Sequence, residues 1–382
     1  MADARQDLSV YFVLGEESGD ALGARIMEAL ARRVPSVRFH GLGGHRMQAL
    51  GLSSLFDVST ISVMGISAVV ARLPQILKRI GQTADDIARV KPDIVVLVDS
   101  PDFTHRVAKR VRDRVPDAKI IKVVCPSVWA WRPGRAKKMR AYIDHVLALL
   151  PFEPRVLADL GGPPATYIGH PMVSRFEAVA IPRHDTVSKE RRLLLLPGSR
   201  RTELRLLLPD FRNTLELLAD RGVRFEAVLP AVPHLEADIR AEIAQWRVKP
   251  EIVSGEDAKI EAFMRADAAL ATSGTVLLEL AIFRIPVISI YRLDRLMHMV
   301  RFLIYGWTAA LPNLIADEAI VPERVGDMVR PGWLARALEA LLRDGPERRA
   351  QLEGYDRVAE ILGRSEPAEE IAARTILEVS GR

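Results

Sequence analysis

Residues 193–200 read Leu-Leu-Leu-Leu-Pro-Gly-Ser-Arg, an apolar run that stops at a Pro-Gly pair. A short apolar run bounded by turn residues predicts a buried strand. Gly198 allows the backbone to approach a ligand closely, and Ser199 is suited to cap a following helix. Arg200 then stands at the carboxyl end of the strand, where open α/β sheets bind ligands, and its guanidinium matches phosphate oxygens. The competing interpretation is a strand and a turn with a solvated arginine.

Similar strand-like runs alternate with helical patterns in two successive series. They cover 8–14, 37–42, 93–98, 119–124, 145–149 and 166–168, and then 193–196, 224–229, 251–253, 267–271 and 286–290. Two series of β-α units predict an α/β protein with two doubly wound, Rossmann-like domains facing a cleft. We expect the first domain at 1–180, the second at 181–362 and a closing C-terminal helix in 363–382. The charged stretch 176–191 is the best linker candidate.

Composition narrows the class of protein. A chain of 382 residues is too long for one ordinary core, and its net charge of +5 is compatible with an anionic substrate, a nucleic acid or an anionic membrane surface. Lys and Arg are dispersed without a recognition module, which argues against nucleic acid. The lone Cys125 fits a reducing compartment. We expect neither a signal peptide nor a membrane span, because the apolar region 271–291 is interrupted by charges and a proline.

A carboxylate follows the apolar run at 93–98. Asp99 ends this predicted strand and opens the stretch Asp-Ser-Pro-Asp-Phe. At the carboxyl end of a parallel strand it would face the cleft, where it is suited to act as a general base. Asp is also a common helix cap, and a helix is expected beyond Pro101. Both interpretations stay open, and Asp102 is the competing, more solvated carboxylate.

The turn after the first predicted strand is rich in acids and glycines. Residues 15–20 read Gly-Glu-Glu-Ser-Gly-Asp and lack the G-x-G-x-x-G pattern of dinucleotide sites. Its carboxylates argue against a bare phosphate site and suit sugar hydroxyls or a cationic transition state. Glu16, Ser18, Gly19 and Asp20 are therefore candidates. Helix capping by Ser18, with the acids favoured by the helix dipole, is the alternative.

A second hydroxyl-rich turn precedes an apolar helix. Ser273, Gly274 and Thr275 follow the run at 267–271 and offer hydroxyl and N–H groups to an anion. Glu279 lies one turn further along a helix that is otherwise apolar, so its carboxylate needs a partner. A ribose diol and a structural salt bridge are equally good partners at this stage.

Residues 127–135 combine two tryptophans with arginines, and Lys137, Lys138 and Arg140 extend the basic stretch. Trp129 is a candidate for stacking on a sugar, although core packing beside a solvated basic face is the simpler interpretation. We place His170 at a domain junction. The histidines lack metal-site spacing and no Walker motif or Asp-x-Asp triplet occurs, so we expect neither a metal nor a cofactor.

Two stretches carry apolar side chains beside basic ones, a pattern that lies on anionic lipid in some proteins and forms core in most. The first comprises Val69, Val70, Leu73, Ile76, Leu77 and Ile80 with Arg72, Lys78 and Arg79. The second is the stretch 296–305 with Arg292, Arg295 and Arg301.

Taken together, the motifs resemble those of the lipid-A-disaccharide synthase family. The ordered pieces are GEESGD at Gly15, GGHRM at Gly43, VMGI at Val63, DSPDF at Asp99, PSVWAW at Pro126, PFE at Pro151, IGHP at Ile168, LLPGSR at Leu195, SGT at Ser273, YR at Tyr291 and LPNLIA at Leu311. They span roughly residues 10 to 320. Glu17 departs from the small residue usual in the family, and Val124-Cys125 from a Tyr-Val-Ser run.

The resemblance implies a metal-independent, inverting glycosyltransferase of GT-B architecture. Its donor would be UDP-2,3-diacylglucosamine and its acceptor 2,3-diacylglucosamine 1-phosphate (lipid X). The products would be the β-1,6-linked disaccharide 1-phosphate and UDP. The resemblance also implies a peripheral location on the anionic inner face of the inner membrane of a Gram-negative bacterium, and it is compatible with a homo-oligomer.

The family pattern assigns Asp99 as the general base and marks Arg200 and Asn313 as further functional residues. Arg200 and the 273–275 turn would hold the UDP pyrophosphate, Glu279 the ribose, and Asn313 either the pyrophosphate or the sugar. Two alternatives remain on this architecture. One is a UDP-sugar 2-epimerase, and the other is a non-catalytic UDP-sugar-binding or membrane-adaptor protein.

Overall fold

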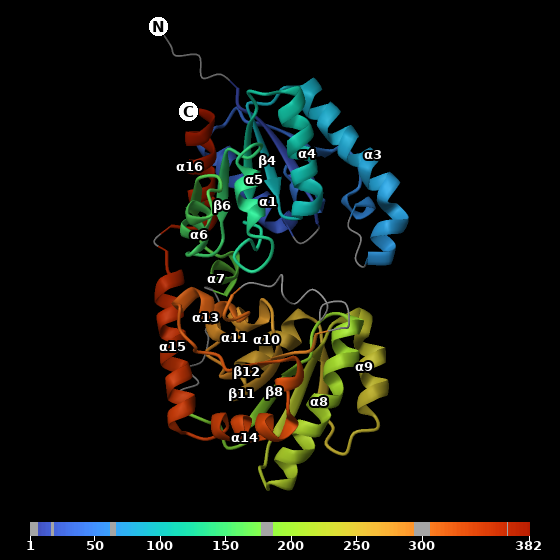
Figure 1. Cartoon of the computed structure of the whole chain (residues 1–382), viewed down its shortest axis with the longest axis vertical. Helices are drawn as coiled ribbons and strands as arrows, with labels where there is room; N and C mark the ends of the chain where they lie inside the picture. Colours follow the sequence, from blue (N-terminus) through green and yellow to red (C-terminus); the bar gives the residue numbers. More distant parts are fainter. Residues whose placement is uncertain (1–6, 17–18, 62–65, 177–185, 294–305, 365) are drawn as a thin grey trace. The chain divides into compact units, whose positions relative to one another are not determined.

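The computed structural model describes residues 7–16, 19–61, 66–176, 186–293, 306–364 and 366–382 (Figure 1). The chain forms two compact units, each with its own sheet. The first comprises Met1–Ser174 with Arg364–Arg382, and the second comprises Arg175–Gly363. The predicted boundary at 180 thus lies a few residues beyond the observed division, and most of the predicted linker falls outside the described residues.

The first unit contains a parallel sheet that is seven-stranded in the described part of the chain. In spatial order its strands are β3 (Ser53–Ser54), β2 (Arg38–Leu42), β1 (Ser9–Leu14), β4 (Ile94–Val98), β5 (Lys119–Val123), β6 (His145–Ala148) and β7 (Ala165–Tyr167). β4 is fully apolar and β1 is apolar except for Ser9 and the Tyr11 hydroxyl. Both strands are almost entirely buried because helices cover both faces of the sheet.

The second unit repeats this plan with a six-stranded parallel sheet, counted over the residues that are described. Its strands in spatial order are β10 (Glu251–Ser254), β9 (Glu226–Ala231), β8 (Arg192–Leu196), β11 (Ala268–Thr272), β12 (Val287–Tyr291) and β13 (Glu323–Val325). The stretch 193–196 is therefore a buried strand, as the sequence predicts, and it lies in the interior of the sheet. The two edge strands β3 and β13 were not predicted, since both are short.

The order of strands reverses once in each sheet. β1 is followed along the chain by its neighbour β2 on one side, whereas β4 lies on the other side of β1 and leads to β5. β8 and β11 stand in the same relation in the second unit. Right-handed crossovers then place the two following helices on opposite faces of the sheet, which opens a crevice at the carboxyl ends of the two strands.

The helices of the first unit surround its sheet (Figure 1). They are α1 (Asp20–Arg33), α2 (His45–Ala49), α3 (Ile66–Val90), α4 (Pro101–Arg114), α5 (Gly134–Met139), α6 (Glu153–Asp159), α7 (Pro171–Phe176), which crosses into the second unit, and α16 (Ala368–Ser380). The corresponding helices of the second unit are α8 (Arg201–Asp220), α9 (Glu236–Ile243), α10 (Glu256–Met264), α11 (Val276–Ile282), α13 (Leu311–Ala316), α14 (Pro331–Leu341) and α15 (Pro346–Leu362). None of the described helices combines the length and the apolar character that a membrane span requires.

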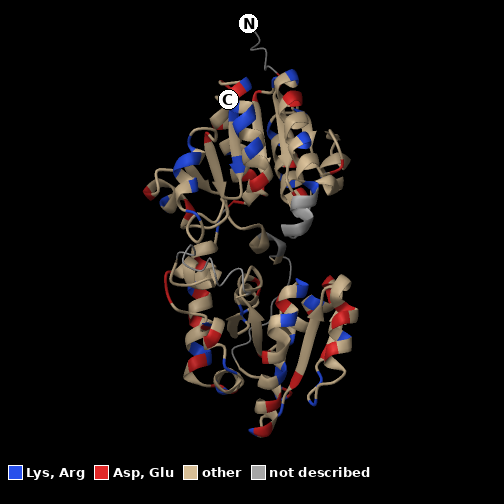
Figure 2. Ribbon diagram, turned by 45° about the vertical axis from the view of Figure 1, so that its right-hand side comes forward, with Lys and Arg blue, Asp and Glu red and all other residues tan. Residues whose placement is uncertain are grey.

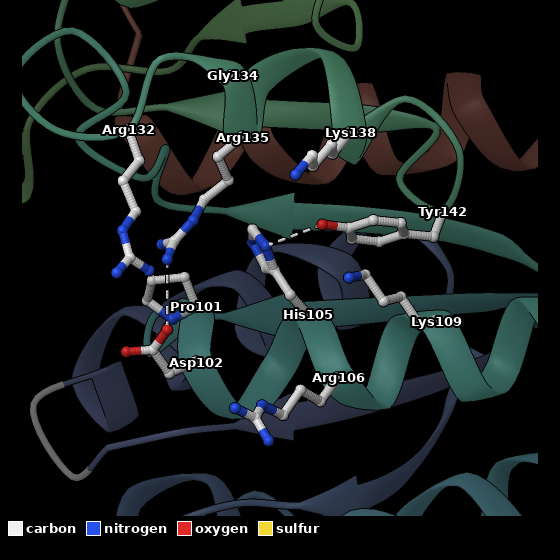
Figure 3. Close-up of a pocket in the computed structure, with 10 residues that line it drawn as sticks. All are labelled: Pro101, Asp102, His105, Arg106, Lys109, Arg132, Gly134, Arg135, Lys138 and Tyr142. Atoms are coloured by element: carbon white, nitrogen blue, oxygen red, sulfur yellow. Dashed lines mark hydrogen bonds and ion pairs between the residues drawn. The ribbon is translucent and has the colours of Figure 1, made fainter.

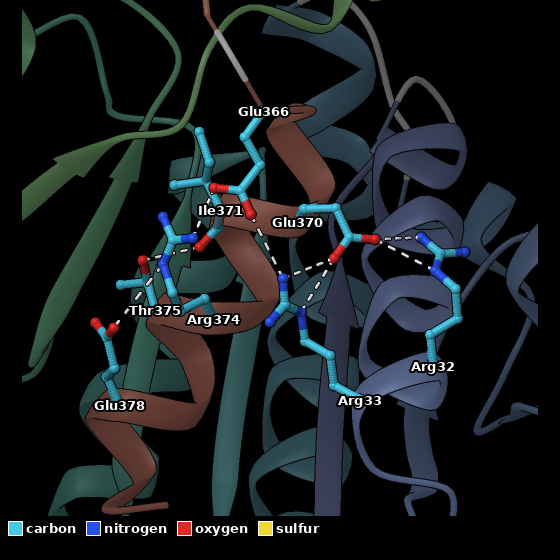
Figure 4. A network of polar contacts seen from close by, with 8 residues as sticks. All are labelled: Arg32, Arg33, Glu366, Glu370, Ile371, Arg374, Thr375 and Glu378. Atoms are coloured by element: carbon cyan, nitrogen blue, oxygen red, sulfur yellow. Dashed lines mark hydrogen bonds and ion pairs between the residues drawn. The ribbon is translucent and has the colours of Figure 1, made fainter.

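The predicted C-terminal helix belongs to the first unit. α16 packs on α1, and Ile371, Ala372 and Ile376 join the apolar core around β1. Figure 4 shows the polar contacts beside this core, where Glu370 pairs with Arg32 at 2.7 Å and with Arg33 at 2.8 Å. These half-exposed pairs contribute little free energy, so the buried apolar stripe of α16 holds it in place.

A buried carboxylate holds the start of β8. Asp267 is almost fully buried and accepts hydrogen bonds from the backbone N–H groups of Ser188 at 2.6 Å and Arg192 at 2.7 Å. It also accepts one from the Ser188 hydroxyl at 2.5 Å. Since each buried N–H group needs an acceptor, this residue ties the chain that enters the second unit to the beginning of β11.

Candidate active site

The crevice of the first unit is bordered by Asp99, which follows β4. Asp99 and Ser100 both have left-handed backbones, with φ values of 53° and 36°. Such conformations are strained in residues other than glycine and recur at functional sites. The Asp99 carboxylate is half-buried, and its Oδ1 accepts the N–H of Ser100 at 2.7 Å. Its Oδ2 accepts no hydrogen bond from any residue that the structure describes, so this oxygen is available to a substrate.

Two glycines let the loop after β1 lie against this strained turn. A Cβ at Gly15 would lie 2.2 Å from the Cβ of Ser100, and a Cβ at Gly19 would lie 2.8 Å from Cδ1 of Leu14. Real Cβ atoms do not approach other heavy atoms this closely. The Cβ of Ser100 is fixed by the backbone, so only glycine fits at position 15, whereas a side chain at position 19 would require the end of Leu14 to shift. The two loops at the strand reversal are therefore in direct contact.

The acidic turn divides into residues with different environments. Glu16 is exposed beside the crevice, and its pKa is raised by partial burial and by the nearby charge of Asp99. Asp20 instead accepts the N–H groups of Arg46 at 2.8 Å and Met47 at 3.2 Å, which caps the start of α2. Asp20 thus has a structural partner, while Ser18 lies outside the described residues.

The strained turn rests on a buried lysine that sequence reasoning missed. Lys122 on β5 is fully buried, and its Nζ donates to the backbone oxygens of Asp99 at 2.5 Å and Val123 at 3.1 Å. Burial lowers the pKa of its ammonium to about 7, against the attraction of the Asp99 carboxylate. A lysine between the apolar residues Ile121 and Val123 was the signal in the sequence.

Trp129 and His170, two further predicted residues of this unit, are engaged in local contacts. Nε1 of Trp129 donates to the buried Glu153 at 3.4 Å, and the ring packs edge-on against Phe152. Burial raises the pKa of Glu153 to about 7. Nδ1 of His170 accepts the N–H of Met172 at 3.2 Å, and burial lowers the pKa of this imidazole to about 4. Their roles toward a substrate remain predictions.

The second unit has a hollow of about 740 Å³ at its strand reversal. The loop after β8 and the loop after β11 line it from two sides, as the switch-point rule requires. Its lining includes the predicted residues Ser199, Arg200, Ser273, Gly274, Thr275 and Glu279. The family resemblance predicted that Arg200 and the 273–275 turn act together, and spacing along the chain alone does not show that these two loops meet.

Arg200 stands at the rim of the hollow. It is the residue immediately before α8, so the predicted cap at Ser199 is wrong by one position. Its Nη1 donates to Glu203 at 2.8 Å, and its side chain is 67% exposed. Exposed ion pairs of this kind contribute about 0–1 kcal/mol. The guanidinium can therefore exchange Glu203 for a phosphate at little cost.

Glu279 is buried in the wall of the hollow and does have a salt bridge. Nζ of Lys259 donates to its Oε2 at 2.7 Å. Its Oε1 has no hydrogen-bond partner among the described residues and stays available to a hydroxyl. Lys259 also lines the hollow and was not found from the sequence.

Asn313 does not line the hollow. Its Nδ2 donates to the Thr308 hydroxyl at 3.1 Å and to the Val321 oxygen at 3.0 Å. Its Oδ1 accepts the N–H groups of Ile320 and Val321 at 3.0 and 2.7 Å. The Asn313 amide thus donates two hydrogen bonds and accepts two, all within the protein, and it holds the segment after α13. This geometry does not support direct contact with a ligand.

Charged side chains are spread over both units. Lys and Arg are interspersed with Asp and Glu over the helices of both units (Figure 2). In the described part of the chain, no three His, Cys, Asp or Glu side chains gather as they would around a metal ion.

Solved structures with this fold define the class of protein. MurG of Acinetobacter baumannii matches with a TM-score of 0.57 at 13% identity, over 97% of this chain and 99% of that one. A UDP-GlcNAc 2-epimerase of Neisseria meningitidis bound to UDP-GlcNAc matches with a TM-score of 0.65 at 12% identity, over 97% of this chain and 100% of that one. At such identities the likeness shows the fold alone, which is that of the GT-B glycosyltransferases.

Sequence relatives identify the family. The family described as lipid-A-disaccharide synthetase matches residues 10–376, and the chain belongs to it. A lipid-A-disaccharide synthase of Rhodopseudomonas palustris is 48% identical over 366 residues, which cover 94% of this chain and 92% of the relative. One from Nitrobacter winogradskyi is 45% identical over 387 residues, which cover 99% and 97%. The activity is therefore lipid A disaccharide synthesis, and the epimerase alternative has only the shared fold in its favour.

Replacing Lys122 by methionine should change how stability depends on pH. The pKa of Lys122 is lower in the folded than in the unfolded chain, so the unfolded chain binds more protons above about pH 7. This group therefore makes the folded protein gain stability as pH rises from about 7 toward the unfolded pKa. Lys122→Met should lose that gain, by up to about 1.4 kcal/mol per pH unit, in urea unfolding at pH 7, 8 and 9.

Lys119→Met is the matched control, because Lys119 lies on the same strand and is exposed. Its unfolding midpoints should shift in parallel with those of the wild type. Identical pH slopes for Lys122→Met and the wild type would show that Lys122 is charged in both states.

Proposed function

We propose that this chain transfers the diacylglucosamine of UDP-2,3-diacylglucosamine to the 6-hydroxyl of lipid X, with inversion and release of UDP. The proposal rests on the side chains found where the strand order reverses in each sheet. One presents a half-buried carboxylate with a free oxygen, and the other presents an arginine, a hydroxyl-rich turn and a buried carboxylate around one hollow.

Asp99 takes the proton from the acceptor hydroxyl. An inverting displacement needs one base at the attacking oxygen, on the face of the donor sugar opposite the leaving group. Oδ1 is held by the Ser100 N–H, and the Asp99 carbonyl is held by Lys122, so the carboxylate is oriented before substrate binds.

The hollow of the second unit holds the UDP end of the donor. Arg200 and the 273–275 turn stabilise the charge that develops on the departing pyrophosphate. Glu279 accepts a hydrogen bond from a ribose hydroxyl through Oε1, while Lys259 holds its other oxygen. Carboxylates outnumber cations in this lining, so the net charge of the hollow does not favour a pyrophosphate. Binding therefore depends on where Arg200 and the backbone N–H groups are placed.

Because both proposed substrates carry acyl chains, the enzyme has to work at a membrane surface, and α3 has a face suited to bind one. Leu73 and Leu77 are 39% and 38% exposed on this helix, and the exposed cations Arg72 and Lys78 lie beside them. An apolar and basic helix face binds the boundary of an anionic bilayer. We infer that this face holds the protein on the inner face of the inner membrane. The second predicted stretch, 296–305, lies outside the described residues.

Asp99→Asn should lower kcat for disaccharide formation by about 10²–10⁴-fold, the usual contribution of a general base. Binding of UDP to the second unit, measured by calorimetry, should stay as in the wild type. Asp102→Asn tests the competing carboxylate. A loss of kcat in Asp102→Asn, with turnover preserved in Asp99→Asn, would transfer the role to Asp102.

Arg200→Gln should weaken UDP binding by about tenfold or more, since it removes a charge-assisted hydrogen bond to phosphate. Arg201→Gln is the control, because Arg201 is exposed, pairs with Asp238 at 3.2 Å and does not line the hollow. Calorimetric titration with UDP measures both variants. Equal affinities for the two would contradict the assignment of Arg200.

Leu73→Gln combined with Leu77→Gln should reduce co-sedimentation with phosphatidylglycerol vesicles by about tenfold, because both side chains lose apolar contact with lipid. Leu217→Gln with Ile361→Gln is the control, since these side chains are equally exposed at 37% and 40% on other helices. Equal losses in both double variants would show that vesicle binding does not depend on the α3 face.

A further inference from the structure

A second pocket lies in the first unit between α4 and α5, with a volume of about 480 Å³ (Figure 3). None of its lining residues belongs to the hollow of the second unit. Asp99 and Ser100 do not line it either, although Pro101 directly follows them. Its lining consists of Pro101, Asp102, His105, Arg106, Lys109, Arg132, Gly134, Arg135, Lys138 and Tyr142.

The charge of this lining is strongly unbalanced. It contains five cations from three segments and a single carboxylate, Asp102. Asp102 pairs only loosely with Arg135, at 3.4 Å, and its side chain is 89% exposed. Arg106 and Lys138, on opposite walls, form no ion pair with any residue that the structure describes. A concave site with such an excess of one sign concentrates anions.

The floor of the pocket consists of buried side chains that contact one another. His105 is 6% exposed, and its Nδ1 lies 3.4 Å from the hydroxyl of the buried Tyr142. Its Nε2 is buried without a hydrogen-bond partner in the described part of the chain. Lys109 lies over the Tyr142 ring at 5.1 Å. Burial and the surrounding cations lower the pKa of His105 to about 3, so this imidazole is neutral and the positive charge resides on the walls.

The pocket begins two residues after the proposed base. Pro101 and Asp102 form the first turn of α4, and Asp99 precedes that turn. The positive end of the α4 dipole therefore adds to the cations at this edge. A hexose whose 6-hydroxyl reaches Asp99 carries its anomeric substituent on the other side of the sugar ring, and this pocket is adjacent to Asp99 along the chain.

We propose that this pocket binds the phosphate monoester of the acceptor substrate, with Arg106, Arg132 and Lys138 as its ligands. The inference rests on the proposed function, since it assigns an anomeric phosphate to the acceptor. A monoester carries close to two negative charges and three acceptor oxygens, which several converging cations match. It would fix the acceptor sugar so that its distant hydroxyl faces Asp99.

The same cations could contact a bilayer phosphate, and the geometry favours the acceptor. The pocket is concave, with a buried His-Tyr pair at its floor and no exposed large apolar side chain in its lining. A surface that lies on lipid needs such apolar groups at its rim. The exposed leucines of the first unit that suit this purpose lie on α3 instead.

The test is the double variant Arg106→Gln with Lys138→Gln, assayed with lipid X and with the same acylated sugar lacking its phosphate. With lipid X, the acceptor KM should rise about ten- to hundredfold, because two charge-assisted contacts are lost. The donor KM should stay unchanged. With the unphosphorylated acceptor, wild type and variant should behave alike, since the lost contacts have no partner there.

Lys137→Gln with Arg140→Gln is the matched control. It removes one lysine and one arginine from exposed positions at α5 that do not line the pocket, and it should leave both acceptor KM values as in the wild type. An equal rise of KM for both acceptors in the pocket variant would overturn the proposal. So would loss of binding to phosphatidylglycerol vesicles with no selective effect on lipid X, which would assign the cations to bilayer headgroups.

Direct binding separates this inference from the proposed function. Calorimetry with detergent-dispersed lipid X should show a Kd that depends on the phosphate and on Arg106 and Lys138. If the wild type forms no disaccharide and this dependence persists, the proposed reaction fails while the phosphate pocket stands. If disaccharide forms and the dependence is absent, the pocket assignment fails alone.

Discussion

The reversal of strand order is the constraint on which the rest of the structure depends. In a parallel sheet all carboxyl ends meet at one edge, and right-handed crossovers force the helices after β1 and β4 onto opposite faces. The loops at this point are left without a helix between them, so they can form a crevice. The second unit repeats the arrangement at β8 and β11. Asp99 and the residues that line the hollow lie at these two positions, whereas Trp129, His170 and Asn313 lie elsewhere along the sheets.

Each crevice is built at a free-energy cost that neighbouring contacts offset. In the first unit, two successive left-handed residues at Asp99 and Ser100 are held by a fully buried lysine. A buried ammonium is unfavourable unless it is paired and hydrogen-bonded, and Lys122 obtains two carbonyl oxygens and the nearby carboxylate. The arrangement exposes one carboxylate oxygen in a fixed orientation, which is what a general base requires.

The second unit prepares its ligands differently. Arg200 and Glu279 are both paired in the protein alone, with Glu203 and Lys259. One pair is exposed and readily exchanged, whereas the other is buried and leaves one oxygen free. The basic pocket on α4 and α5 adds a third arrangement, in which five cations line one hollow with a single, exposed carboxylate. Together these environments match a leaving pyrophosphate, a ribose and an acceptor phosphate.

The sequence by itself determined the two α/β domains, the central strands and most of the residues at the strand ends, because apolar runs and turn residues are local signals. It also indicated the family through ordered motifs. Only the tertiary structure decided that Asn313 and Asp20 serve internal contacts, that the C-terminal helix returns to the first unit, and that Lys122 and Lys259 support the sites. Those outcomes depend on which distant segments meet, and periodicity and spacing along one chain carry no information about such pairings.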